Sequence, residues 1–452
     1  MYMADRLLHL GDIKKLFNKD PEAYDPRVGI EVEKIGLYYE KSDPPTYSGK
    51  RGYLAVLGAL YEQLGWEIVK QKGNQITSMK RGNAYLHLES DGRIELAGSP
   101  HDSIHDLARE MRIHQNEIVE ISKMFGIIWL GCGYHPFVRN ADIQNIKDDR
   151  KWLILEYLEA SKKMSGNDYG VAWWKKTSGI HVNLDYRDEE DFALKNRVFT
   201  RISPIITAMF ANSPFSKMAF SGHMSFRSHV IHNTALPQFD IPKDLYESKF
   251  DVDAWLAHLG SLPLVLIERE GQWLKPNCTF NEFLEKGFEG HSPCMDDFEL
   301  HMKSAWKDIK CKSVIELRFI DSLPPHLVPS AAALVKGLAY DQNNLHILDE
   351  MTKDWAYDDF MNLRHDSAKY GLQATFNGVP ILNLAKKLIE MSKSGLQSNS
   401  VRDIENNDES LYLQEISDFV FIKEKSPAEW LVENWMGKWR KSFYPVVDWL
   451  QY

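Results

Sequence analysis

Short segments of the chain alternate apolar and polar residues, which is the pattern of a half-buried β-strand. In VGIEVEKIGLYY (28–39), Ile30 and Val32 share one face, whereas Glu31 and Glu33 share the other. Five further segments alternate in the same way: YLHLE (85–89), RIEL (93–96), GIHVNLDY (179–186), HMSFRSHV (223–230) and VIELRFI (314–320). We therefore expect six strands, each with one apolar and one polar face.

Helical spacing of apolar residues predicts two long helices between these strands. The first covers residues 102–125, where Asp102 or Ser103 can cap its start, and the second covers about residues 190–211. IIWLGCG (127–133) reads as a short buried strand. Because strands and helices do not alternate regularly, we expect an α+β fold with an antiparallel sheet.

The last part of the chain is predicted to be mostly helical. Helical patterns dominate from about residue 330, and the polar stretch at 394–410 reads as a surface loop. We found no internal repeat and no low-complexity segment. We therefore expect one domain over residues 1–452, with a mixed core at 1–325 and a mainly helical part at 326–452.

Composition narrows the possible functions. The chain has 452 residues, of which 44% are hydrophobic and 26% charged, and its net charge is −10. This acidic balance argues against nucleic acid as the main partner. No apolar run approaches the ~18 residues of a membrane-spanning helix, and the N-terminus lacks a signal-like apolar region. The four cysteines show no metal or disulfide spacing, so we expect free thiols and a cytoplasmic protein.

The polar faces of the six predicted strands are rich in carboxylates. If the strands form one sheet, this face carries Glu31, Glu33, Glu89, Glu95, Glu316, His181, Arg227 and Arg318. An antiparallel sheet with one solvated face would also explain the pattern. However, five carboxylates on one face would raise each other's pKa unless cations compensate, and hard divalent ions prefer such ligands. Both a divalent-metal site and a solvated sheet face therefore fit the pattern, and the metal site is the more specific hypothesis.

The hairpin between the second and third strands gives this hypothesis a geometric condition. Asp91-Gly92 is a turn signal between the strands that carry Glu89 and Glu95. A loop of odd length, such as residues 90–92, places both glutamates on one face, whereas a two-residue loop separates them. The metal hypothesis requires the odd loop.

Six motifs in order resemble those of the glutamate–cysteine ligase family of the plant and proteobacterial type. They are GIEVEKIG (29–36), LESDGRIELAGSP (88–100), IHVNLDY (180–186), ANSPFSK (211–217), MSFRSHV (224–230) and VIELRFID (314–321). The C-terminal segment at 426–450 also resembles the ending of that family, so the likeness covers about residues 25–450.

The resemblance implies a fold and a reaction. Family members have a glutamine-synthetase-like core, in which a curved antiparallel sheet forms a funnel. They use ATP and Mg²⁺ to join the γ-carboxylate of glutamate to the amine of cysteine through γ-glutamyl phosphate, with ADP and phosphate as products. The chain is therefore expected to act on small molecules, as a monomer or homodimer, without nucleic-acid or membrane partners.

The resemblance also implies roles for individual residues. The expected Mg²⁺ ligands are Glu31, Glu33, Glu89, Glu95 and Glu316. The expected substrate or ATP ligands are Arg227, Arg318, His181, Asn183, Lys217 and Arg269. Arg227 and Arg318 are also the expected catalytic residues, because an arginine fork can hold a carboxylate or a transferring phosphoryl group. Arg269 matches a family arginine that is either structural or substrate-binding.

Two segments depart from the family pattern. After MSFRSHV the family has a longer stretch with an arginine, whereas this chain has the short IHNTALPQFD (231–240). Before IELR it has WKDIKCKS (306–313), with lysines where the family has FP-x-VR. The amine acceptor is therefore open: cysteine, or another amine in a specialised pathway. A non-catalytic nucleotide-binding relative is a third hypothesis, against which all five glutamates count.

Overall fold

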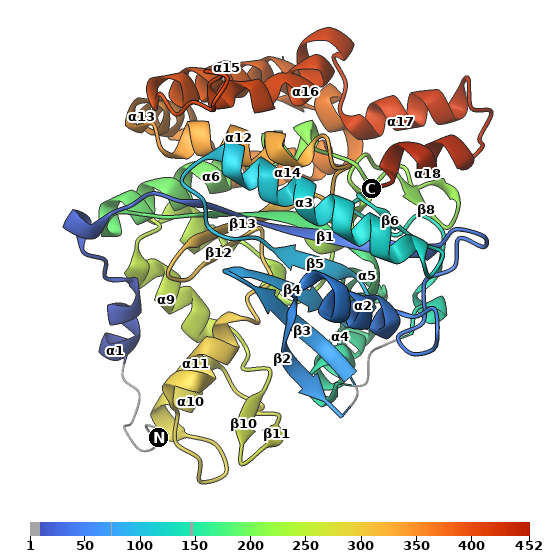
Figure 1. Cartoon of the computed structure of the whole chain (residues 1–452). Helices are drawn as coiled ribbons and strands as arrows, with labels where there is room; N and C mark the ends of the chain where they lie inside the picture. Colours follow the sequence, from blue (N-terminus) through green and yellow to red (C-terminus); the bar gives the residue numbers. More distant parts are fainter. Residues whose placement is uncertain (1–9, 74, 145–147) are drawn as a thin grey trace.

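A large antiparallel sheet forms the centre of the computed structural model, which describes residues 10–73, 75–144 and 148–452. The sheet has nine strands in the order β12-β13-β7-β1-β5-β4-β3-β2, and β6 pairs with the second half of β1 (Figure 1). These strands are β1 (Val28–Tyr38), β2 (Glu67–Lys72), β3 (Gln75–Arg81), β4 (Ala84–Leu88), β5 (Ile94–Ala97), β6 (Ile127–Leu130), β7 (Gly179–Leu184), β12 (Ile309–Cys311) and β13 (Ile315–Asp321). The predicted antiparallel α+β class is confirmed.

Three short hairpins lie outside this sheet. They are β8 (Phe215–Ser216) with β9 (Ala219–Phe220), β10 (Ile267–Arg269) with β11 (Gln272–Leu274), and β14 (Thr375–Phe376) with β15 (Val379–Pro380). The chain contains no described helix that is both long and apolar enough to cross a membrane. All four cysteines are free thiols, as predicted.

Helices pack on the sheet in the first and last parts of the chain. The first nine are α1 (Leu10–Lys14), α2 (Tyr53–Leu64), α3 (Ile104–Lys123), α4 (Asp149–Ser165), α5 (Tyr169–Lys176), α6 (Glu189–Met209), α7 (Phe226–His232), α8 (Lys243–Glu247) and α9 (Val252–Ser261). The others are α10 (Phe280–Lys286), α11 (Met295–Met302), α12 (Val328–Ala339), α13 (Gln342–Thr352), α14 (Tyr357–Tyr370), α15 (Ile381–Ser398), α16 (Gln414–Ser417), α17 (Pro427–Met436) and α18 (Tyr444–Leu450). The mainly helical C-terminal part is thus observed.

One face of the sheet is covered by helices and forms the main core. Val28, Ile30 and Val32 of β1 are buried in one cluster with apolar residues of β7, β13, α6 and α12. In Figure 1, α12 and α15 form successive layers on this side of the sheet, with α3 beside them. The alternation in the sequence therefore places the apolar side chains of β1 under the helices and its glutamates on the opposite face.

Both long helices appear where the apolar spacing predicts them. Ser103 is the residue that caps α3, because its hydroxyl accepts a hydrogen bond from the amide of Asp106 at 3.1 Å. Helix α6 covers residues 189–209, and β6 occupies the predicted buried strand after α3. Among the strands, five of the six alternating segments lie in the sheet.

The sixth alternating segment is a correction. HMSFRSHV (223–230) does not form a strand, because α7 begins at Phe226. Ser225 starts this helix by accepting a hydrogen bond from the amide of Ser228 at 3.2 Å. Phe226 and Val230 are also spaced by four residues, so the short segment fits a helical period as well as an alternating one. Arg227 therefore projects from the first turn of a helix and not from a strand.

Candidate active site

The register of the sheet brings the predicted acidic residues together. Glu33 of β1 lies directly opposite Glu95 of β5, and Glu31 lies opposite His181 of β7. The hairpin between β4 and β5 has the odd loop that the metal hypothesis requires, because the amide of Glu89 pairs with the carbonyl of Arg93. Glu89 and Glu95 therefore share one face with Glu31 and Glu33.

These side chains line one pocket of about 410 Å³ on the face opposite the main core. Its acidic members are Glu31, Glu33, Glu89, Glu95 and Glu316, and its basic members include Arg93, Arg150, Lys151, His181, Arg227, Lys303, Lys310, Lys312 and Arg318. The volume is within the usual range for small-molecule sites. The pocket combines acidic side chains of the sheet with cations from several elements.

His181 lies at the centre of the acidic group. Its Nδ1 donates to Glu31 at 2.7 Å and lies 3.8 Å from Glu95 and 3.7 Å from Glu316. Glu31, Glu95 and His181 each offer one ligand atom, and these three atoms lie within 4.8 Å of one another. Carboxylate oxygens this close can share a divalent cation.

The carboxylates differ in how well the protein compensates their charge. Burial, followed by repulsion from Glu31, Glu89 and Glu33, raises the pKa of Glu95 well above its usual value. Burial and Glu316 would also raise the pKa of Glu31, but the hydrogen bond from His181 lowers it overall. Glu95 is therefore the member of the group that most needs an added cation to ionise.

The protein's own cations compensate two other glutamates. Burial would raise the pKa of Glu89, but Lys151 and Arg93 lower it to about 2. Burial opposes ionisation of Glu316 as well, but Arg318, followed by Lys310 and Lys312, holds its pKa well below the usual range. The sequence predicts that the carboxylates raise each other's pKa unless cations compensate, and for Glu31, Glu89 and Glu316 the protein itself supplies this compensation.

The two predicted catalytic arginines line the pocket from different elements. Arg227 is 4% exposed, and its Nη2 donates to the backbone carbonyl of Arg318 at 2.6 Å. Its Nε and Nη1 have no hydrogen-bond partner among the described residues. Arg318, on β13, pairs with Glu316. Arg227 therefore keeps two buried donors for an anion that enters the pocket.

The other predicted substrate ligands divide into three situations. Asn183 donates to Glu31 at 3.0 Å, so it supports the acidic group without lining the pocket itself. Lys217 is exposed in the turn between β8 and β9, outside this pocket. Arg269 forms a bidentate ion pair with Asp297, with both contacts at 2.6 Å, and does not line the pocket.

Sequence reasoning did not assign several basic residues of the pocket. Arg93 pairs with Glu33 at 3.1 Å, and Lys312 pairs with Glu316 at 2.6 Å. Lys151 reaches the pocket from α4, which no sequence pattern connects with the sheet. The alternation in IKCKS (309–313) was an available signal, because Lys310 and Lys312 are two residues apart at β12 and directly after it.

Comparisons with known proteins identify the family of the chain and agree with its fold. A sequence model of the family described as "Glutamate-cysteine ligase family 2 (GCS2)" matches residues 27–446, so the chain belongs to this family. Relatives include glutamate–cysteine ligase B, chloroplastic, of Oryza sativa subsp. japonica, 27% identical over 94% of this chain and 84% of that protein. The chloroplastic glutamate–cysteine ligase of Solanum lycopersicum is 27% identical over 94% of this chain and 79% of that protein.

A solved structure has the same fold at low sequence identity. It is the glutamate–cysteine ligase of Francisella tularensis in complex with AMP, which aligns with a TM-score of 0.56 and 14% identity. The alignment covers 94% of this chain and 87% of that chain. The chain is therefore an enzyme of the ligase class by family, and it shares its overall fold with this bacterial enzyme.

Proposed function

We propose that the chain is an ATP-dependent ligase that joins the γ-carboxylate of glutamate to the amine of cysteine. The reaction would pass through γ-glutamyl phosphate and release ADP and phosphate. The observation that most supports this proposal is the pocket in which Glu31, Glu95 and His181 converge, in a chain that belongs to the glutamate–cysteine ligase family. The name of the bacterial neighbour, a complex with AMP, supports a nucleotide as one ligand.

The acidic residues fit divalent magnesium. Burial and the neighbouring carboxylates raise the pKa of Glu95, and carboxylate oxygens are the ligands that Mg²⁺ prefers. Glu31, Glu33 and Glu95 would hold the ions, with Glu89 and Glu316 at the edges of the group. Bound Mg²⁺ supplies neutralisation of phosphate charge and orientation of the γ-phosphoryl group.

The arginines have separate tasks in this proposal. Arg227 would bind the anionic group of an amino-acid substrate through its two free donors. Arg318 would face the transferring phosphoryl group, and its pairing with Glu316 fixes its orientation. Lys310 and Lys312 would add positive charge at the same end of the pocket.

One observation favours an acceptor amine other than cysteine as the alternative substrate. The two segments that depart from the family pattern contact each other: the amide of Trp306 donates to the carbonyl of Gln238 at 2.9 Å. Lys307 also donates to the carbonyl of Asp240 at 2.6 Å. Trp306 lines the pocket with Trp173 and therefore joins the departing segments to the site. An amine other than cysteine is thus the alternative for the same γ-glutamyl chemistry.

We infer the wider setting from the same features. The chain would work as one catalytic domain, because one core cluster includes residues from Ile13 to Val420. It would act as a monomer or homodimer on small molecules. The free thiols support a reducing compartment, and we propose the cytoplasm, although plant relatives are named as chloroplastic.

The experiment is an acceptor screen with purified protein. Protein, ATP, Mg²⁺ and glutamate are combined with each amino acid or common amine in turn, and nucleotide and product masses are recorded. We expect ADP and phosphate, with the highest kcat/KM for cysteine. Accumulation of AMP would contradict the acyl-phosphate chemistry, because the carboxylate must attack the γ-phosphorus to release ADP. ADP release with another amine but not with cysteine would establish the alternative acceptor.

A further inference from the structure

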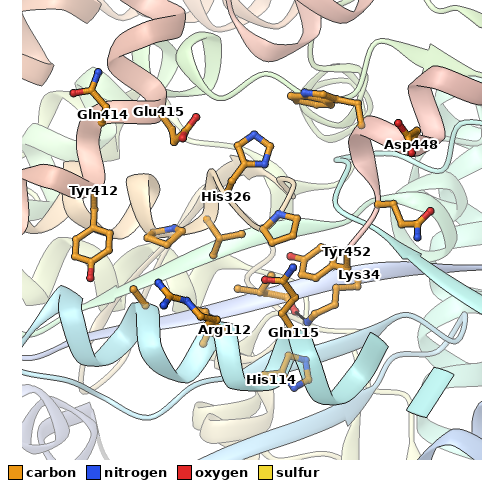
Figure 2. A pocket seen from close by; sticks show the side chains of 18 of the residues that line it. Lys34, Arg112, His114, Gln115, His326, Tyr412, Gln414, Glu415, Asp448 and Tyr452 are labelled. Carbon is orange, nitrogen blue, oxygen red and sulfur yellow. Dashed lines mark hydrogen bonds between the residues drawn. The ribbon is translucent and has the colours of Figure 1, made fainter. Parts of the chain in front are cut away.

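A second, larger pocket lies on the opposite face of β1 from the acidic pocket. Its volume is about 800 Å³, and it is bounded by α3, the residues after β13 and the C-terminal helices (Figure 2). The residues that matter here are Lys34, Arg112, His114, Gln115, Trp449 and Tyr452. The proposed ligase chemistry uses none of these residues.

Lys34 contributes a buried amino group without a carboxylate partner, and burial lowers its pKa to about 7. It is 1% exposed, and its Nζ donates to the carbonyl of Val32 at 3.0 Å, the only acceptor found among the described residues. It also lies 5.5 Å from the ring centroid of Tyr452. By contrast, the buried Lys195 and Lys336 each pair with a carboxylate, at 2.8 and 2.7 Å. A lysine ammonium has three donors, so Lys34 retains donors that face the pocket.

His114 provides a buried polar atom without a partner in the lining of the same pocket. It is 3% exposed, and its Nε2 has no hydrogen-bond partner among the described residues. Figure 2 shows His114 and Gln115 projecting from α3 near Lys34 and Tyr452. Buried polar groups are normally satisfied, so a histidine nitrogen without a partner and a lysine with one backbone acceptor beside the same cavity indicate that a ligand completes their hydrogen bonds.

The remaining lining decides which ligand chemistry fits. Trp449 and Tyr412 give the pocket aromatic walls, and Arg112 is an exposed cation on α3. Glu415 and Asp448 are exposed across the pocket from α3, where their charges would repel a polyanion (Figure 2). The pocket therefore suits one anionic group at Lys34 joined to an apolar body.

We propose that this pocket binds a small organic monoanion, a carboxylate on an aromatic or aliphatic body, whose oxygens accept hydrogen bonds from Lys34 and His114. Alternation along β1 separates this site from the acidic pocket, because Lys34 points to the opposite face from Glu33. Its occupant would not compete with magnesium or nucleotide. The inference goes beyond the proposed ligase function and does not depend on it.

The test is calorimetric titration of the full chain with phenylacetate, without ATP or glutamate. We expect saturable binding that becomes at least about tenfold weaker in Lys34→Met, because a charge-assisted hydrogen bond contributes more than a neutral one. Lys163→Met removes an exposed lysine of α4 and is the matched control. Benzyl alcohol should bind more weakly than phenylacetate because it lacks the charge. Phenyl phosphate should also bind more weakly than phenylacetate, because the carboxylates of Glu415 and Asp448 repel a dianion more strongly.

A second variant protects the test against misfolding. Gln115→Trp adds bulk to a half-buried lining position and should abolish phenylacetate binding while Lys34 is intact. Phenylacetate binding should persist in Glu31→Gln, which alters only the acidic pocket. Absence of phenylacetate binding, equal affinity in Lys34→Met and the unaltered chain, or competition with Mg²⁺ would each overturn the proposal.

Discussion

The two faces of β1 show how one strand serves stability and chemistry at once. On one face, Ile30 and Val32 are 1% exposed and pack beneath helices. On the other, Glu31 and Glu33 line a polar pocket and accept hydrogen bonds from residues of the neighbouring strand β7. The pattern repeats every two residues, so a single backbone geometry positions both sets.

The two faces differ in whether the chain itself supplies the groups that pack against them or compensate their charge. On the apolar face the chain supplies the packing partners, which are residues of α6 and α12. On the acidic face the chain compensates only some of the charge. Arg93 pairs with Glu33 and Lys312 pairs with Glu316, whereas the pKa of Glu95 stays well above its usual value. Substitutions on the first face should therefore change folding, and those on the second should change metal and substrate chemistry.

The largest effect on stability is expected on the apolar face. Ile30→Ala removes a fully packed side chain and should lower the free energy of unfolding by about 2–5 kcal/mol. Denaturant unfolding monitored by circular dichroism measures the change. The affinity of the remaining folded protein for Mn²⁺ should stay close to that of the unaltered chain. A large loss of metal affinity without loss of stability would break the proposed division between the two faces.

Substitutions on the acidic face should give the reverse result. Glu31→Gln and Glu33→Gln should each lower kcat at least about 100-fold, because they weaken charge stabilisation at the phosphoryl site. Glu285→Gln, at an exposed position on α10, is the matched control and should leave kcat unchanged. Steady-state ADP release measures all three variants. Near-normal turnover in Glu31→Gln or Glu33→Gln would remove that residue from the site.

The two arginines allow a finer comparison within the acidic pocket. Lysine keeps the charge but loses the planar fork, so each replacement should cost about tenfold. Arg227→Lys should raise KM for an amino-acid substrate more than KM for ATP, whereas Arg318→Lys should mainly lower kcat. Initial rates with each substrate varied in turn separate these outcomes. Equal effects of both variants on KM for ATP would contradict the separate roles.

The smallest effect concerns the pH dependence of stability. Because the pKa of Glu95 is raised in the folded protein, its protonated form stabilises the fold at low pH, and this contribution is lost as pH rises through that raised pKa. In EDTA, Glu95→Gln should therefore reduce the loss of stability with rising pH, by at most about 1.4 kcal/mol per pH unit. Saturating Mg²⁺ should reduce the same slope in the unaltered chain. Identical slopes for both proteins would contradict the raised pKa.

Local pattern was enough to predict much of the sheet and its polar face. Alternation identified the strands that carry Glu31, Glu33 and Glu316, and the hairpin condition at residues 90–92 is met. Such features depend on neighbouring residues alone. The pairing of Glu33 with Glu95 depends on which strands become neighbours, and no single segment encodes that choice.

The rest of the site depends on long-range packing. Lys151 enters from α4, and Arg227 enters from a helix whose short sequence fits two periods. Lys34 sits in the same motif as the glutamates, but only the packing of α3 and the C-terminal helices turns its surroundings into a pocket. The alternation in the sequence places Lys34 on the apolar face of β1, but it does not indicate that a pocket lies beside this part of the strand.

Direct titration of Mn²⁺ by electron paramagnetic resonance tests the central claim, that the acidic face of β1 holds divalent metal. The unaltered chain should bind Mn²⁺ in competition with Mg²⁺. The double variant Glu31→Gln/Glu33→Gln should bind it at least about 30-fold more weakly while it retains the unfolding transition of the unaltered chain, because two anionic ligands are lost. Unchanged Mn²⁺ affinity in a folded double variant would contradict the account.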